Sequence, residues 1–228
     1  MNFISLKPGS TVEGEAIEAY RSEGQASHYV HLIAGVHGDE VEGAYLLQQL
    51  FAWLREEETV DVKVPLVIVP ILNVDGYRVG TRGNAHGVDL NRNLPADSWV
   101  RECKNPQYFP GEKPLSEPEN QYFVSLLNKY PPSLIISFHA WKPMINYNGD
   151  CRKVAVFLSN YNTYPVVEKL KKHPTPGSLG EYAPHELGIP VLTFEAPQLS
   201  GGGKLKDIWA ESATAFKELL QSDLIQSF

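Results

Sequence analysis

The amino-acid sequence predicts an α/β fold, built on a mostly parallel mixed β-sheet with helices on both faces. Short apolar segments rich in Val and Ile recur along the chain, and such runs are typical of strands buried on both faces. Amphipathic helical patterns separate these runs, which favours crossover connections between parallel strands. With 43% apolar residues, a chain of 228 residues can bury a full core. We therefore expect one domain over residues 1–228.

Five segments have the continuous apolar character of buried strands, and we predict strands at 28–35, 64–72, 134–138, 154–158 and 190–194. Apolar residues at helical spacing predict helices at 40–57 and from 206 to the end of the sequence. Ser116 followed by Glu119 is typical of a capping box, which would begin a helix that ends at Tyr130 before two prolines. The segment 76–118 has little periodicity and many Gly, Asn, Asp and Pro residues, so we expect a functional loop there.

Composition and charge exclude several classes of protein. The 20 basic and 27 acidic residues give a net charge of −7 with no block of like charges, which argues against a nucleic-acid partner. No run of 18 apolar residues occurs, and the first ten residues lack the features of a secretion signal. We expect a cytoplasmic protein without a membrane partner. Cys103 and Cys151 show no metal-binding or disulfide spacing and are expected to be free thiols.

Two histidines and a glutamate are placed to share a metal ion. His37 and Glu40 follow the predicted strand 28–35, and His139 follows the strand 134–138. Because the carboxyl ends of parallel strands meet at one edge of a sheet, these side chains can converge. Two histidines and one glutamate form a catalytic zinc set that leaves a position for water. Each residue alone also fits a simpler role, as a surface or core histidine or as an acid at a helix N-terminus.

A third strand brings another carboxylate to the same edge, since Glu195 follows the apolar run 190–194. Zinc hydrolases need a carboxylate that is not a ligand, to take a proton from water and pass it to the leaving amine. We therefore interpret Glu195 as a candidate general base. The alternative is a glutamate in a salt bridge at the end of a strand.

The loop 76–118 supplies cations that could bind a carboxylate or stabilise an oxyanion. Arg78, Arg82 and Arg92 lie within 15 residues, and Asp89 and Asn91 lie close to Arg92 in the sequence. The residues alone do not separate the roles of the three arginines. Salt bridges on a solvated loop explain them equally well.

Six segments together resemble the zinc metallocarboxypeptidase family. GVHGDEVEG, NVDGYR, GVDLNRN, SEPE, IISFH and TFE occur in the order that this family shows. The resemblance implies a zinc-dependent hydrolase of amide bonds, with one Zn²⁺ held by His37, Glu40 and His139. It also implies that Glu195 acts as general base and acid.

The resemblance further implies roles for the loop residues. Arg82 would polarise the scissile carbonyl, and Asn91 and Arg92 would bind the carboxylate of the residue after the scissile bond. Asp89 would orient His37, since metal-bound imidazoles need a partner on their second nitrogen. The family's digestive members carry a mobile tyrosine some twenty residues before the catalytic glutamate, where this sequence has His173 and no tyrosine.

The segments VGTRGNAHGVDLNRNLPADSW, GEKPLSEPE and TPGSLG are similar to a small bacterial branch of the family. This similarity implies hydrolysis of the bond between γ-D-glutamate and meso-diaminopimelate in murein peptides, with a small murein tripeptide as the binding partner. Diaminopimelate carries a second amine and carboxylate, so extra charges are expected in the pocket, with Lys142, Arg152 and Glu181 as candidates.

Two alternatives remain open. Hydrolases of N-acyl amino acids, of the aspartoacylase and succinylglutamate desuccinylase type, resemble the same motifs, but they usually continue into a further β-rich domain. Here about 33 residues follow Glu195, and their pattern is that of one helix. A non-catalytic binder of peptidoglycan fragments is disfavoured, because such a protein would not need Glu195.

Overall fold

The computed structural model describes residues 1–57, 59–168 and 173–228. In this part of the chain, eight strands form one sheet in the order β1-β4-β6-β5-β7-β10-β8-β9. Their bounds in that order are Phe3–Ser5, Tyr20–Ser22, Leu66–Val69, Tyr29–Ala34, Pro132–Trp141, Val191–Pro197, Met144–Asn148 and Val166–Val167. The central strands β6, β5, β7 and β10 are parallel, while β4 and β8 pair antiparallel to them. The predicted fold class is confirmed.

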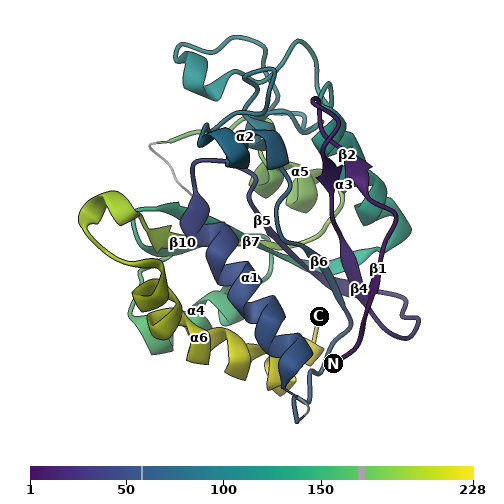
Figure 1. Ribbon diagram of the computed structural model, residues 1–228, viewed down its shortest axis with the longest axis vertical. Coiled ribbons are helices and arrows are strands. Elements are labelled where there is room, and N and C mark those ends of the chain that lie inside the picture. Colours follow the sequence, from purple (N-terminus) through teal and green to yellow (C-terminus); the bar gives the residue numbers. More distant parts are fainter. Residues whose placement is uncertain (58, 169–172) are drawn as a thin grey trace.

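Helices cover both faces of the sheet. One face packs against α1 (Val41–Glu56), α4 (Arg152–Asn162), α6 (Leu205–Gln221) and the short α7 (Asp223–Gln226). The other packs against α3 (Pro118–Lys129) and α5 (Leu179–Glu186), with α2 (Val74–Val79) and the small sheet of β2 (Gly9–Ser10) and β3 (Ala16–Ile17) at its margin. Figure 1 shows α1 and α6 side by side across the first face. None of the helices in the described ranges is long and apolar enough to cross a bilayer.

Aromatic packing fastens α6 to the sheet. The ring of Phe216 lies 4.9 Å from the ring centroids of both Phe138 on β7 and Phe194 on β10. All three side chains are buried. Burial of each such ring is worth about 1.5–3 kcal/mol, and aromatic pairs add to this. Helix α6 therefore packs directly on β7 and β10, the strands that carry His139 and Glu195 near their carboxyl ends.

Three predictions about elements were wrong. The run 154–158, predicted as a strand, lies inside helix α4, where Val154, Ala155 and Leu158 share the buried face. A short apolar run does not distinguish a strand from a buried helix turn. The capping box at Ser116 does not form, because α3 begins one residue later, after Glu117, with a proline in its first turn. The final helix stops at Gln221 and a separate turn of helix follows.

Two glycines allow the close approaches that build the functional edge. A Cβ atom on Gly43 would lie 2.6 Å from the carbonyl oxygen of Phe138, so this glycine lets α1 pack directly on β7. A Cβ atom on Gly38 would lie 2.1 Å from the carbonyl carbon of Gly76. Real Cβ atoms do not approach so closely, hence only glycine fits the turn between β5 and α1. This turn carries His37 and Glu40.

Candidate active site

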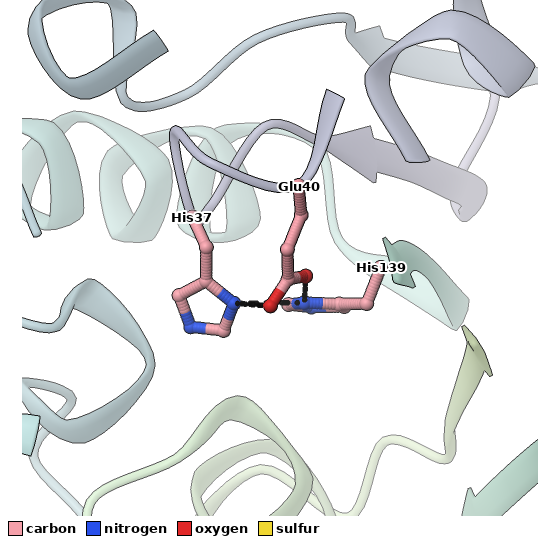
Figure 2. Close-up of side chains that lie close together, drawn as sticks. All are labelled: His37, Glu40 and His139. Atoms are coloured by element: carbon pink, nitrogen blue, oxygen red, sulfur yellow. Dashed lines mark hydrogen bonds and ion pairs between the residues drawn. The ribbon is translucent and has the colours of Figure 1, made fainter. Parts of the chain in front are cut away.

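Two histidines and a glutamate converge where β5 and β7 end (Figure 2). The Nδ1 atom of His37 lies 2.7 Å from Oε1 of Glu40, and the Nδ1 atom of His139 lies 2.8 Å from Oε2 of the same carboxylate. The two Nδ1 atoms are 3.2 Å apart. All three side chains are largely buried. The ligand atoms thus face one point, as a shared cation requires.

The charge around this point favours a cation. Burial lowers the pKa of His37, but the carboxylates of Glu40 and Asp89 outweigh it and raise that pKa to about 9. The site therefore stabilises a positive charge on the imidazole. A metal ion and a proton compete for the same ligand nitrogen. A divalent metal bound in place of the imidazole proton would therefore be stabilised by the same two carboxylates. The donor set of two imidazoles and a carboxylate fits Zn²⁺.

Asp89 fixes the orientation of His37. Its carboxylate is fully buried and accepts hydrogen bonds from Nε2 of His37 at 3.1 Å, Nε of Arg82 at 2.9 Å and the backbone N–H of Asn91 at 2.9 Å. Although burial opposes ionisation, the partners His37 and Arg82 hold the pKa of Asp89 well below its usual range. With Nε2 committed to Asp89, the Nδ1 atom of His37 is left for a metal. Ser137 contacts Nε2 of His139 at 2.9 Å and leaves its Nδ1 similarly available.

Glu195 lies beside the triad without joining it. The register pairs Glu195 of β10 with His139 of β7, so both side chains leave the same edge of the sheet. The Oε2 atom of Glu195 is buried and has no hydrogen-bond partner among the described residues. Burial and, more weakly, the charge of Glu40 raise the pKa of Glu195 to about 7. A cation on the triad would lower this pKa again. An unpaired buried carboxylate is costly, and a carboxylate with a perturbed pKa in a cavity is a candidate for proton transfer.

The structure separates the three arginines. Arg82 bonds to Asp89 and also donates through Nη1 to Oε1 of Glu40 at 3.1 Å. Arg92 forms no ion pair with the described residues, and its Nη1 donates at 2.6 Å to the backbone oxygen of Asn91. Burial lowers its pKa, while the charge of Asp89 opposes that change. Arg78 instead pairs with Glu15 at an exposed position and does not line the cavity.

These groups line one cavity of about 890 Å³. The three candidate metal ligands and Glu195 contribute to its wall, together with Arg82, Asn91 and Arg92. Asp89 does not line the cavity and lies behind His37. Of the three charged residues suggested for side-chain recognition, only Glu181 lines the cavity. Lys142 lies over the ring of Trp141 instead. His173 also lines the cavity, and its ring packs edge-on against Trp141 at 5.3 Å.

Polar residues that the sequence reading missed form another part of the wall. Asn146 of β8 pairs with Thr193 of β10, and Asn148 pairs with Val191 two residues along. Because alternate residues of a strand share a face, Asn146, Asn148 and Thr193 lie on the face of Glu195, and all three line the cavity. Gly180 of α5 packs against them, since a Cβ atom there would lie 2.9 Å from Oδ1 of Asn148. The alternation of polar residues at 146 and 148 was the only signal for them in the sequence.

The family model described as zinc carboxypeptidase matches residues 3–198 of this chain. The chain belongs to the zinc carboxypeptidase family. A member of this family uses one zinc ion, and the triad of His37, Glu40 and His139 fits it. The predicted family, enzyme class and cofactor are thereby confirmed.

Individual members of the zinc carboxypeptidase family are similar over most of the chain. Murein peptide amidase A of Escherichia coli (strain K12) is 32% identical over 184 residues, which cover 74% of this chain and 71% of that protein. Murein peptide amidase A of Vibrio campbellii is 27% identical, covering 94% of this chain and 86% of that protein.

Solved structures show the same fold. The crystal structure of a murein-tripeptide amidase from Escherichia coli O157 has a TM-score of 0.78 at 24% identity and covers 94% of this chain and 90% of that one. A carboxypeptidase A from Helicoverpa armigera has a TM-score of 0.80 at 17% identity, covering 99% of this chain and 69% of that one. The zinc carboxypeptidase fold is thus present across the chain.

Proposed function

We propose that this zinc peptidase hydrolyses the amide bond between γ-D-glutamate and meso-diaminopimelate in small murein peptides. The observation that carries this proposal is the cavity, which joins the triad and Glu195 to the cation Arg92 and to a wall of amides. The similarity to two proteins named murein peptide amidase A supports the same substrate.

The metal would be held by Nδ1 of His37, Nδ1 of His139 and the carboxylate of Glu40. When bound there, zinc supplies a Lewis acid that polarises a carbonyl and makes water more acidic. Glu195 would take a proton from the attacking water at its unpaired Oε2 atom. As the C–N bond breaks, Glu195 would return that proton to the amine nitrogen, so that the products are a carboxylic acid and a free amine.

Two arginines would stabilise different negative charges of the substrate. Asp89 fixes Arg82 through Nε, and we assign the Nη groups of Arg82 to the carbonyl oxygen, which gains negative charge as water adds. Arg92 carries a charge with no carboxylate partner in the described part of the chain, and it would bind the C-terminal carboxylate of the substrate. Asn91 binds the N-terminus of α5 through Oδ1, which accepts from the N–H of Leu179 at 2.9 Å, and its amide group would assist Arg92.

The side chain of the terminal residue would extend toward Asn146, Asn148 and Thr193. These amide and hydroxyl groups, with the carboxylate of Glu181 nearby in the wall, suit the second amine and carboxylate of diaminopimelate. An apolar terminal side chain would leave the same polar groups without hydrogen-bond partners. Unpaired polar groups discriminate between substrates more strongly than a missing apolar contact does. Specificity would therefore follow from polar groups that need a polar ligand.

A mass-spectrometric screen of the purified zinc enzyme tests this function. The panel contains L-Ala-γ-D-Glu-meso-diaminopimelate, the same peptide ending in L-leucine, an ordinary α-linked tripeptide and an N-acyl amino acid. We expect cleavage of the first compound at the γ-D-glutamyl bond, and a shift toward the leucine peptide in Asn148→Leu. Cleavage of the N-acyl amino acid alone would contradict the proposal and favour an acylase. The cytoplasmic location expected from the sequence stays a prediction that cell fractionation can test.

A further inference from the structure

Tyr108 contacts both arginines of the cavity. Its ring centroid lies 5.1 Å from the Cζ atom of Arg82 and 5.4 Å from the Cζ atom of Arg92. The face of an aromatic ring attracts a guanidinium within about 6 Å, so both contacts fall in the attractive range. One tyrosine therefore touches two cations to which we assign different tasks.

The two guanidinium groups need such a partner because they repel each other. Burial lowers the pKa of Arg92, and the charge of Arg82 lowers it further, while the carboxylate of Asp89 opposes both effects. Arg82 is fixed by Asp89 and Glu40, whereas among the described residues Arg92 has only a backbone oxygen and the ring of Tyr108. In the described part of the chain, Tyr108 is thus the side chain that contacts both Arg82 and Arg92.

The backbone around Tyr108 is fastened to the segment that carries Arg92. The carbonyl oxygen of Phe109 accepts from the N–H of Asp89 at 2.8 Å, and that of Pro110 accepts from Nδ2 of Asn93 at 2.8 Å. Tyr108 itself ends a 3₁₀ turn, Pro106–Tyr108. Movement of the ring relative to Arg92 is therefore restricted even though 40% of Tyr108 is exposed.

We propose that Tyr108 is a positioning residue, which sets the spacing of Arg82 and Arg92 so that one reaches the scissile carbonyl while the other binds the terminal carboxylate. The inference rests on the proposed function, because it needs a substrate with a free C-terminal carboxylate. The aromatic ring performs this task, and the hydroxyl group is not required.

The test compares Tyr108→Leu with Tyr108→Phe in the zinc-loaded enzyme, using the best peptide of the screen as free acid and as C-terminal amide. Loss of two ring contacts predicts a fall of about 5- to 30-fold in kcat/KM for the acid in the leucine variant. The ratio of kcat/KM for acid over amide should fall with it, which general damage to the fold would not cause. The phenylalanine variant should restore both values to within about two-fold.

Tyr161→Leu is the matched control, because Tyr161 is 42% exposed on α4 and does not line the cavity. This variant should behave as wild type. An unchanged acid-to-amide ratio in Tyr108→Leu would overturn the proposal, and so would loss of activity in Tyr108→Phe, since the hydroxyl would then be the working group. If wild type cleaves no peptide of the panel, the proposed function fails first, and that result is distinct from either outcome.

Discussion

Replacing Asp89 by asparagine should weaken zinc binding without removing any zinc ligand. The buried carboxylate of Asp89 accepts from three donors, of which His37 and Arg82 are side chains. Asparagine has the same shape but one oxygen, so its NH₂ group must face either the guanidinium or the imidazole. One charge-assisted hydrogen bond is lost, which is worth about 1.5–3 kcal/mol.

This loss corresponds to a 10- to 100-fold rise in the Kd for zinc, because outer partners of ligating histidines typically contribute about that much. Competition of the variant against a zinc chelator near neutral pH measures the Kd directly. Thermal unfolding of the zinc-free proteins shows how much of the change is general destabilisation.

Asp75→Asn provides a matched control. Asp75 is also a buried carboxylate, which accepts from the hydroxyl of Thr11 at 2.7 Å and from the N–H of Glu13 at 3.0 Å, but it does not line the cavity. We expect this variant to lose stability and to keep the wild-type Kd for zinc. If Asp89→Asn binds zinc as tightly as wild type, or if both variants lose affinity equally, the orienting role of Asp89 is refuted.

Two further predictions concern binding and pH. Arg92→Lys keeps the charge but loses the planar fork, so KM for a free-acid peptide should rise about 10-fold or more while KM for the corresponding amide changes little; equal effects on both would contradict a carboxylate contact. Burial lowers the pKa of His31 from 6.5 to about 4 even though its ring bonds the backbone of Tyr130. The unfolded chain therefore binds a proton first as the pH falls, and about 3 kcal/mol of stability should be lost between pH 6.5 and 4. Denaturant unfolding across this range should show the loss in wild type and a weaker dependence in His31→Gln.

The metal triad was predictable from the sequence because each ligand stands just after a recognisable apolar strand. Apolar runs with the composition of buried strands precede all four residues, His37, Glu40, His139 and Glu195. The edge at which they meet follows from the parallel order of those strands. To predict that these side chains meet in space, it was enough to recognise where three strands end.

Other parts of the site depend on contacts between distant segments that carry no periodic pattern. The residue pattern alone did not distinguish Arg78, Arg82 and Arg92, and the roles of Arg82 and Arg92 came from the family resemblance. In the structure the three arginines have different partners. Tyr108 lies in an irregular loop, so nothing local indicated its contact with two arginines. The strand β8 was missed because its alternation of apolar and amide residues is short, and the polar wall at Asn148 was missed with it.

In the proposed mechanism, Glu195 moves protons beside the metal and does not bind it. Glu195→Gln keeps the size of the side chain but cannot accept a proton, so kcat should fall about 10²- to 10⁴-fold while zinc remains near one ion per chain. Both quantities are measured on one preparation, by peptide turnover and by metal analysis. Normal turnover in this variant would contradict this role of Glu195. Loss of the zinc would contradict it too, because Glu195 would then be a ligand.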